Sequence, residues 1–88
     1  MVSKAFTIKN KTGLHMRTAN AFVTAVSKFD SDVNIVFNGK TINGKSIMNV
    51  MAACIKCGHE ITVECSGSDE NAALEAAAAL IEDGFGEE

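Results

Sequence analysis

The chain has 88 residues, of which 47% are hydrophobic and 22% are charged, and its formal net charge at pH 7 is −3. This length predicts a single domain spanning residues 1–88, and the composition is typical of a folded protein rather than a disordered one. The negative net charge argues against nucleic acid as the main partner, because a phosphate backbone requires a basic surface.

The first half of the chain predicts a strand, a helix and a hairpin. Residues 2–8 place apolar side chains at even positions, as in a strand, and residues 9–14 have the composition of a loop. From residue 16 the apolar period is helical, and residues 29–32 end this helix. Its apolar face consists of Ala19, Phe22, Val23, Val26 and Phe29. Residues 33–37 alternate as a second strand, and Asn38 and Gly39 favour a type I′ turn into a third strand over residues 40–43.

The second half predicts a short helix, a strand and a longer helix. Ser46 is a suitable N-cap for the short helix, which Gly58 ends. The expected inward stripe of this helix is Ile47, Val50, Met51 and Cys54. Residues 60–65 alternate as a strand with one wet face, and Ser68 or Asp69 would cap a helix that stops at Gly84. The expected buried stripe of this last helix is Leu74, Ala77, Ala78 and Ile81.

The elements therefore follow the order β-α-β-β-α-β-α. Four short strands joined by turns and helices favour an α+β fold, an open-faced two-layer sandwich. We expect a four-stranded antiparallel sheet with three helices on one face.

The sequence also predicts where the protein resides. Residues 1–9 lack the continuous apolar run of a signal peptide, and the longest weakly apolar run, residues 76–81, is far shorter than a membrane span. We therefore expect a cytoplasmic protein with no membrane insertion. In a reducing compartment its three cysteines would be free thiols.

His15 is the strongest candidate for chemistry. It follows a loop and directly precedes the first helix, where unpaired backbone N–H groups stabilise an anion. A neutral imidazole can attack phosphorus, and the Arg17 guanidinium could bind phosphate oxygens. Gly13 would permit close approach of the backbone. The alternative is a surface histidine that merely begins a helix.

Two other motifs compete with this hypothesis. Residues 39–46 match the phosphate-binding loop pattern G-x4-G-K-S, but the match contains a predicted turn and strand, and too little chain remains for parallel βαβ units. Cys54 and Cys57, with His59 and Cys65 nearby, could suggest a redox pair or a zinc site. The alternative places Cys54 and Cys65 on inward faces, where cysteine behaves as a small hydrophobe.

Two residues near the second helix also have functional interpretations. As a helix N-cap, Ser46 could be phosphorylated with support from the helix dipole, and the alternative is simple capping. Met48 lies off the apolar stripe and could be exposed near His15, or it could be an ordinary surface methionine.

Three segments together resemble one family. They are residues 12–19 (TGLHMRTA), residues 38–51 (NGKTINGKSIMNVM) and residues 66–72 (SGSDENA). In motif spacing, length and element order they resemble HPr, the histidine-containing phosphocarrier family of the bacterial sugar phosphotransferase system, over essentially the whole chain.

This resemblance implies the function of a carrier that is not itself a complete enzyme and needs no metal or cofactor. Enzyme I would phosphorylate His15 on Nδ1 at the expense of phosphoenolpyruvate, and His15 would pass the group to sugar-specific IIA proteins or domains. Arg17 matches the arginine that attends the phosphate, and Thr12 and Gly13 match the loop before the histidine. The resemblance places the docking surface at Met16, Asn20, Thr24, Ser27, Ile47, Met48 and Met51. A monomer fits a protein that must dock several partners.

The resemblance also implies regulation. Ser46 resembles the regulatory serine of the low-GC Gram-positive branch, which an ATP-dependent kinase/phosphorylase modifies, and the phosphoserine form acts with a catabolite-control regulator. The chain would then act mainly as a carrier or, alternatively, mainly as a regulatory binding module. One departure is Met16-Arg17-Thr18, where the family usually has Ala-Arg-Pro, and the Thr18 hydroxyl could compensate for the missing proline by capping. A paralogous regulator lacks the phosphorylatable histidine, and His15 argues against that assignment.

Overall fold

The structure, a computed structural model, describes residues 1–86 and has the predicted order of elements. The strands are β1 (Val2–Thr7), β2 (Asp32–Phe37), β3 (Lys40–Asn43) and β4 (Glu60–Ser66). The helices are α1 (Met16–Ser27), α2 (Ile47–Ala52) and α3 (Glu70–Glu82). A short 3-10 helix, η1 (Gly84–Gly86), follows α3 and was not predicted.

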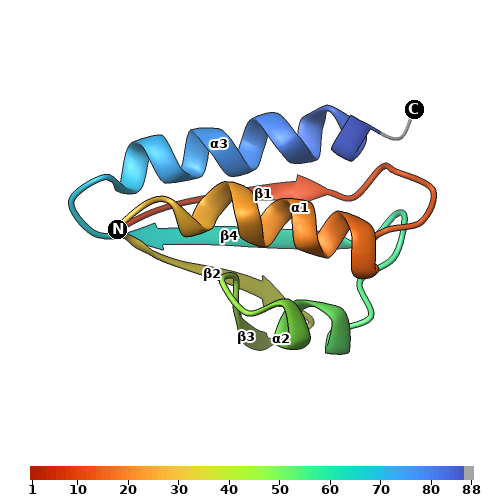
Figure 1. Cartoon of the computed structure of the whole chain (residues 1–88). Coiled ribbons are helices and arrows are strands. Elements are labelled where there is room, and N and C mark those ends of the chain that lie inside the picture. The colour runs from red at the N-terminus through yellow and green to blue at the C-terminus, as the bar shows by residue number, and fades with distance from the viewer. Residues whose placement is uncertain (87–88) are drawn as a thin grey trace.

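The strands form one antiparallel sheet in the order β1-β4-β2-β3. Asn38 and Gly39 form the turn between β2 and β3 with φ angles of 55° and 81°, as the type I′ turn requires. Figure 1 shows the three helices on one face of this sheet. The predicted α+β open-faced sandwich is therefore confirmed.

The core lies between the sheet and the helices. In β4, the side chains of Ile61, Val63 and Cys65 are buried, whereas Thr62 and Glu64 between them are only half-buried. This alternation is what a sheet with one covered face requires. The α1 residues predicted to face inward supply the opposing surface, and Phe22 is fully buried there.

The predicted inward stripe of α2 was partly wrong. Val50 is fully buried, but 37% of Met51 is exposed. Cys54 is exposed and lies beyond the helix, which ends at Ala52. The helix has only six residues, and Cys54 turns the chain out of it with a φ of 55°, so the helical period does not continue. Ile55 occupies the buried position instead.

Smaller differences concern the ends of α1 and the face of α3. Phe29 lies beyond the end of α1, although it still packs, half-buried, against the core. The fully buried residues of α3 are Ala73, Ala77 and Ile81, whereas Leu74 and Ala78 are half-buried. With this face α3 packs against β1, β4 and α1. None of the helices in residues 1–86 is both long and apolar enough to cross a membrane.

Candidate functional site

The loop before α1 is fixed to a distant segment of the chain. The Leu14 N–H donates a hydrogen bond of 2.8 Å to the Ile55 carbonyl oxygen. Gly13 has a φ of 65°, and a Cβ atom built on it would lie 2.5 Å from the Ile55 oxygen and 2.6 Å from the Lys56 Cα. The sequence predicted that Gly13 allows a close backbone approach, and the neighbour it approaches is residues 55–56. Only glycine fits this position without displacing that backbone.

Asn10 holds the same loop from inside, although the sequence marked it only as a loop residue. It is buried, and its Nδ2 donates to the Gly13 carbonyl at 2.9 Å and to Thr12 Oγ1 at 3.4 Å. The preference of asparagine for bonding nearby backbone in turns is the signal that points to such a role. Thr12 itself is exposed on this loop.

Thr18 closes the loop onto the first turn of α1. Its hydroxyl donates to the Gly13 carbonyl at 2.5 Å and accepts the His15 N–H at 3.1 Å. The side chain is buried, so these bonds are shielded from water. The Thr18 hydroxyl thus fixes the start of the helix by hydrogen bonding, which is the capping role expected from the sequence.

His15 is the N-cap residue of α1. Its Nδ1 accepts the backbone N–H of Arg17 at 3.4 Å, so Nδ1 carries the lone pair that faces the first turn. The Nε2 atom is buried. Nδ1 therefore presents its lone pair to the first turn of the helix, and this hydrogen bond is long enough to be weak.

His15 lies at the edge of an open depression formed by α1 and the start of α2. The residues that line it are His15, Met16, Arg17, Asn20 and Ile47. Arg17 is exposed, so its guanidinium is free of packing constraints and can reach an anion at this surface. The structure thus brings together five of the residues that the sequence nominated.

The other nominated docking residues lie outside this depression. Thr24 and Ser27 are exposed further along α1, off its buried face. Met48, 81% exposed, and Met51 lie on α2, and Met48 joins Met16, 68% exposed, among the large apolar side chains on the surface.

Ser46 caps α2 as predicted. Its Oγ accepts the Asn49 N–H at 3.3 Å, and the residue is half-buried. Its neighbour Ile47 lines the depression beside His15. A charge added at Ser46 would therefore stand next to that surface.

The phosphate-binding loop match is not supported by the structure. Residues 39–46 contain the end of one turn, the strand β3 and a second turn at Gly44 and Lys45, and β3 pairs antiparallel with β2. Lys45 Nζ donates to the Phe29 carbonyl at 2.7 Å instead of pointing into an anion cradle.

The cysteines are all free thiols. Cys54 and Cys57 are exposed, and Cys57 Sγ lies 3.7 Å from the Lys9 carbonyl oxygen. Cys65 is buried on the inward face of β4, as expected, and burial together with the nearby charges of Glu70 and Asp69 raises the pKa of its thiol. Within residues 1–86, no three His, Cys, Asp or Glu side chains form a group that could hold a metal ion.

Fold and site together define a class: small open-faced α+β proteins in which a histidine caps the first helix at the surface. Residues 2–83 match the family described as the PTS HPr component phosphorylation site. The chain therefore belongs to the HPr family of phosphocarriers.

Solved structures of relatives agree with this assignment. HPr-C-His from Thermoanaerobacter tengcongensis is 42% identical, with a TM-score of 0.97, and the match covers 100% of this chain and 99% of that one. The phosphocarrier protein HPr from Bacillus anthracis is also 42% identical, with a TM-score of 0.87 and coverage of 91% and 95%. Crh, a catabolite repression protein of Bacillus subtilis, is 40% identical, with a TM-score of 0.76 and coverage of 94% and 95%, and its crystal structure is a domain-swapped dimer.

Proposed function

We propose that this chain accepts a phosphoryl group on His15 from enzyme I and donates it to sugar-specific IIA proteins. The observation that supports this most directly is the geometry of His15, whose Nδ1 faces the first turn of α1 beside Arg17 at an open surface. The proposal includes a monomeric, cytoplasmic carrier that is phosphorylated stoichiometrically and is not itself an enzyme.

The proposed reaction is a direct transfer of the phosphoryl group between two imidazole nitrogens. The Nδ1 lone pair attacks the phosphorus of a phosphohistidine on enzyme I in line, and the P–N bond to enzyme I breaks as its electron pair returns to that imidazole. The Arg17 N–H, now bonded weakly to Nδ1, and the Arg17 guanidinium would hold the phosphoryl oxygens. Because a carrier must also release the group, weak stabilisation suits it better than strong stabilisation.

The proposal is tested by incubating the protein with enzyme I and phosphoenolpyruvate, followed by ³¹P NMR and intact-mass analysis. We expect one acid-labile phosphate on the wild type and none on His15→Ala. The matched control is His59→Gln, which removes the other histidine, one that stacks on Phe37 away from the depression. If the wild type takes up no phosphate while a known carrier does, the proposal is wrong.

A second function is favoured by the position of Ser46. A serine kinase/phosphorylase would modify Ser46, and the phosphoserine form would bind a catabolite-control regulator. The N-cap geometry supports this role, because the first-turn amides of α2 stabilise a phosphate placed there, and the similarity to Crh supports it independently. His15→Ala separates the two functions, because it should abolish transfer and leave regulation through Ser46 intact.

Phosphorylation of Ser46 should weaken transfer at His15. We expect Ser46→Asp to slow phosphorylation by enzyme I by about tenfold or more. Docking of enzyme I beside Ile47 would have to overcome electrostatic repulsion by the new negative charge and the cost of removing its water. The measurement is the initial rate of phosphotransfer at limiting enzyme I. Ser68→Asp adds the same charge at an exposed position just before α3 and should leave the rate unchanged, because the start of α3 lies at the end of α1 away from His15 (Figure 1). Equal rates for Ser46→Asp and the wild type would contradict this prediction.

A further inference from the structure

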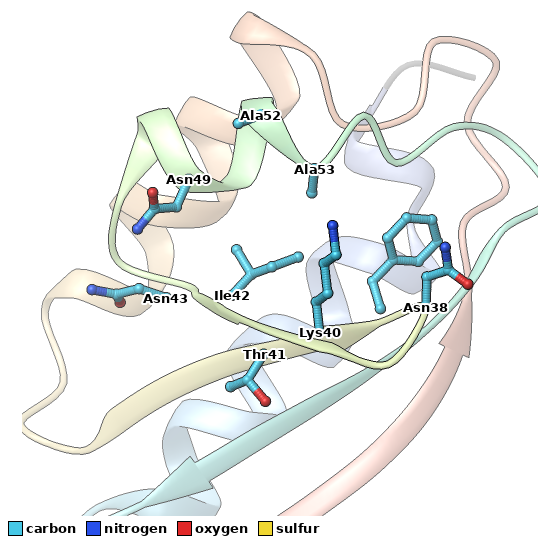
Figure 2. A pocket seen from close by; sticks show the side chains of 9 residues that line it. Asn38, Lys40, Thr41, Ile42, Asn43, Asn49, Ala52 and Ala53 are labelled. Atoms are coloured by element: carbon cyan, nitrogen blue, oxygen red, sulfur yellow. The ribbon is translucent and has the colours of Figure 1, made fainter.

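A second concave region lies between the β2–β3 hairpin and α2 (Figure 2). It has a volume of about 400 Å³ and is lined by the end of β2, the turn, β3 and residues 49–53. It shares no lining residue with the depression at His15. The volume falls within the range of small-molecule sites in proteins.

The polar groups in this cavity favour an anion. Lys40 supplies an ammonium group, and Asn38, Asn43 and Asn49 supply amide groups, whereas no lining residue is acidic. Figure 2 shows the amino group of Lys40 pointing toward Ala53, with Asn38 at one end of the cavity and Asn43 and Asn49 at the other. Asn38 and Asn49 can turn their amide N–H groups toward a bound oxygen, whereas Asn43 Oδ1 accepts the Lys45 N–H at 2.9 Å and leaves Nδ2 to donate.

The rest of the lining is apolar. Ile42 lies beside Lys40 in Figure 2, and Ala52 and Ala53 form the opposite wall from α2 and its C-cap. Two alanines in this wall leave room that larger side chains would fill. A ligand that contacts both the polar and the apolar lining residues would carry one negative head group on a short aliphatic chain.

We propose that this cavity binds small organic anions of that kind, namely carboxylates or phosphate monoesters. Binding would also act on α2. Asn49 lines the cavity with its side chain while its backbone N–H holds the Ser46 Oγ. An occupant in contact with Asn49 therefore perturbs the turn that presents Ser46, whether or not His15 carries phosphate.

The test is a titration of the ¹⁵N-labelled protein, followed by amide chemical shifts. The probes are hexanoate and hexyl phosphate, with hexanol and inorganic phosphate as controls for the aliphatic body and the head group. We expect saturable shifts at residues 38–43 and 46–53 with at least one organic anion, and none at residues 15–20. Comparing hexanoate with hexyl phosphate identifies the preferred head group. Saturation by hexanol or inorganic phosphate with equal affinity, or no saturable shift with either anion, would overturn the proposal.

Two variants make the test specific. Lys40→Gln should raise the dissociation constant about tenfold, because it removes a charge-assisted hydrogen bond. Ala52→Leu should abolish binding by filling the cavity while preserving helix propensity. Lys28→Gln, which removes an equal charge at the C-cap of α1, should bind as the wild type does. Unchanged affinity in Lys40→Gln would exclude this site.

Discussion

The position of His15 depends on residues that need not touch a partner. The Thr18 hydroxyl forms hydrogen bonds with both the His15 N–H and the Gly13 carbonyl, and the Asn10 side chain donates a hydrogen bond to the same carbonyl. Gly13 in turn lies against the backbone of residues 55–56. The imidazole is therefore placed by contacts that fix the loop before it and the helix after it.

Replacing Gly13 should disturb both stability and transfer. In Gly13→Ala, the new Cβ would clash with the Ile55 carbonyl oxygen at a φ that disfavours alanine. We expect a loss of about 2 kcal/mol or more in the free energy of unfolding. The rate of His15 phosphorylation should fall as well, because the loop must shift.

Gly39→Ala is the matched control, measured by the same chemical denaturation. Gly39 also has a positive φ, of 81°, but nothing lies within 4 Å of a Cβ built there. It should lose only about 1 kcal/mol, from backbone strain, and should keep its transfer rate. Equal losses in the two variants would show that the contact with residues 55–56 is unimportant.

At the scale of single residues, the sequence nominates candidate functional residues more readily than the residues that support them. His15, Arg17 and Gly13 could be nominated because their chemistry and their place before a helix are local properties. The contact between Gly13 and Ile55 could not, since it joins residues far apart in the chain through backbone atoms that carry no sequence signal. The role of Asn10 depends on the same folded loop.

Among the helices and strands, α2 contributes residues to both concave regions of the surface. Its first residue, Ile47, lines the His15 depression, and its C-cap, Ala53, lines the second cavity. Local rules located its start, because serine is a strong N-cap signal. They misplaced its end, because Cys54 takes a left-handed conformation that usually belongs to glycine.

This left-handed cysteine predicts a stabilising substitution. Cys54→Gly should raise the free energy of unfolding by about 1 kcal/mol, because glycine adopts a φ of 55° without a steric penalty. Chemical denaturation with reducing agent present measures the change. Asn38→Gly, at the same φ of 55°, should gain less, since asparagine already tolerates this conformation. A loss of stability in Cys54→Gly would mean that the cysteine side chain makes a compensating contact.

Across the whole molecule, Asp69 connects the start of α3 with the loop between α1 and β2. The sequence predicted a helix cap, and Asp69 is the N-cap residue, but its side chain makes no bond to its own helix. Its carboxylate instead accepts the Asp30 N–H at 3.0 Å and the Ser31 N–H at 2.9 Å, and it is also bonded to the Ser31 hydroxyl. The Ser31 hydroxyl, followed by the backbone N–H groups, lowers the pKa of Asp69 below its ordinary value of 3.8.

This lowered pKa predicts part of the acid sensitivity of the protein. Because Asp69 binds a proton less readily in the folded state than in the unfolded state, its contribution is complete above the ordinary value of 3.8 and is lost as the pH falls through the lower, folded pKa. Asp69→Asn should therefore be less stable at neutral pH and should lose less stability than the wild type on acidification. Thermal unfolding followed from neutral to acidic pH measures both effects.

Glu75→Gln provides the control for this prediction, because Glu75 is an exposed carboxylate on the same helix. It should keep the steeper acid dependence of the wild type. If the stability of Asp69→Asn falls with pH as steeply as that of the wild type, the Asp69 carboxylate does not contribute to the acid sensitivity of the protein. The bond could not be read from the sequence, since Asp69 and Ser31 lie 38 positions apart.

The strand order has a consequence for how the protein is made. β4 pairs with both β1 and β2, yet it is the last strand in the chain, and of the described sheet only the β2–β3 hairpin forms from neighbouring strands. A nascent chain on the ribosome thus carries β1, α1 and the hairpin before the strand that joins them exists. Until residues 60–66 emerge, β1 has no partner strand and the apolar face of α1 has no complete sheet to cover. Folding of the sheet must therefore wait until residues 60–66 have been made, and during that interval the unfinished chain exposes the surface that the folded protein buries.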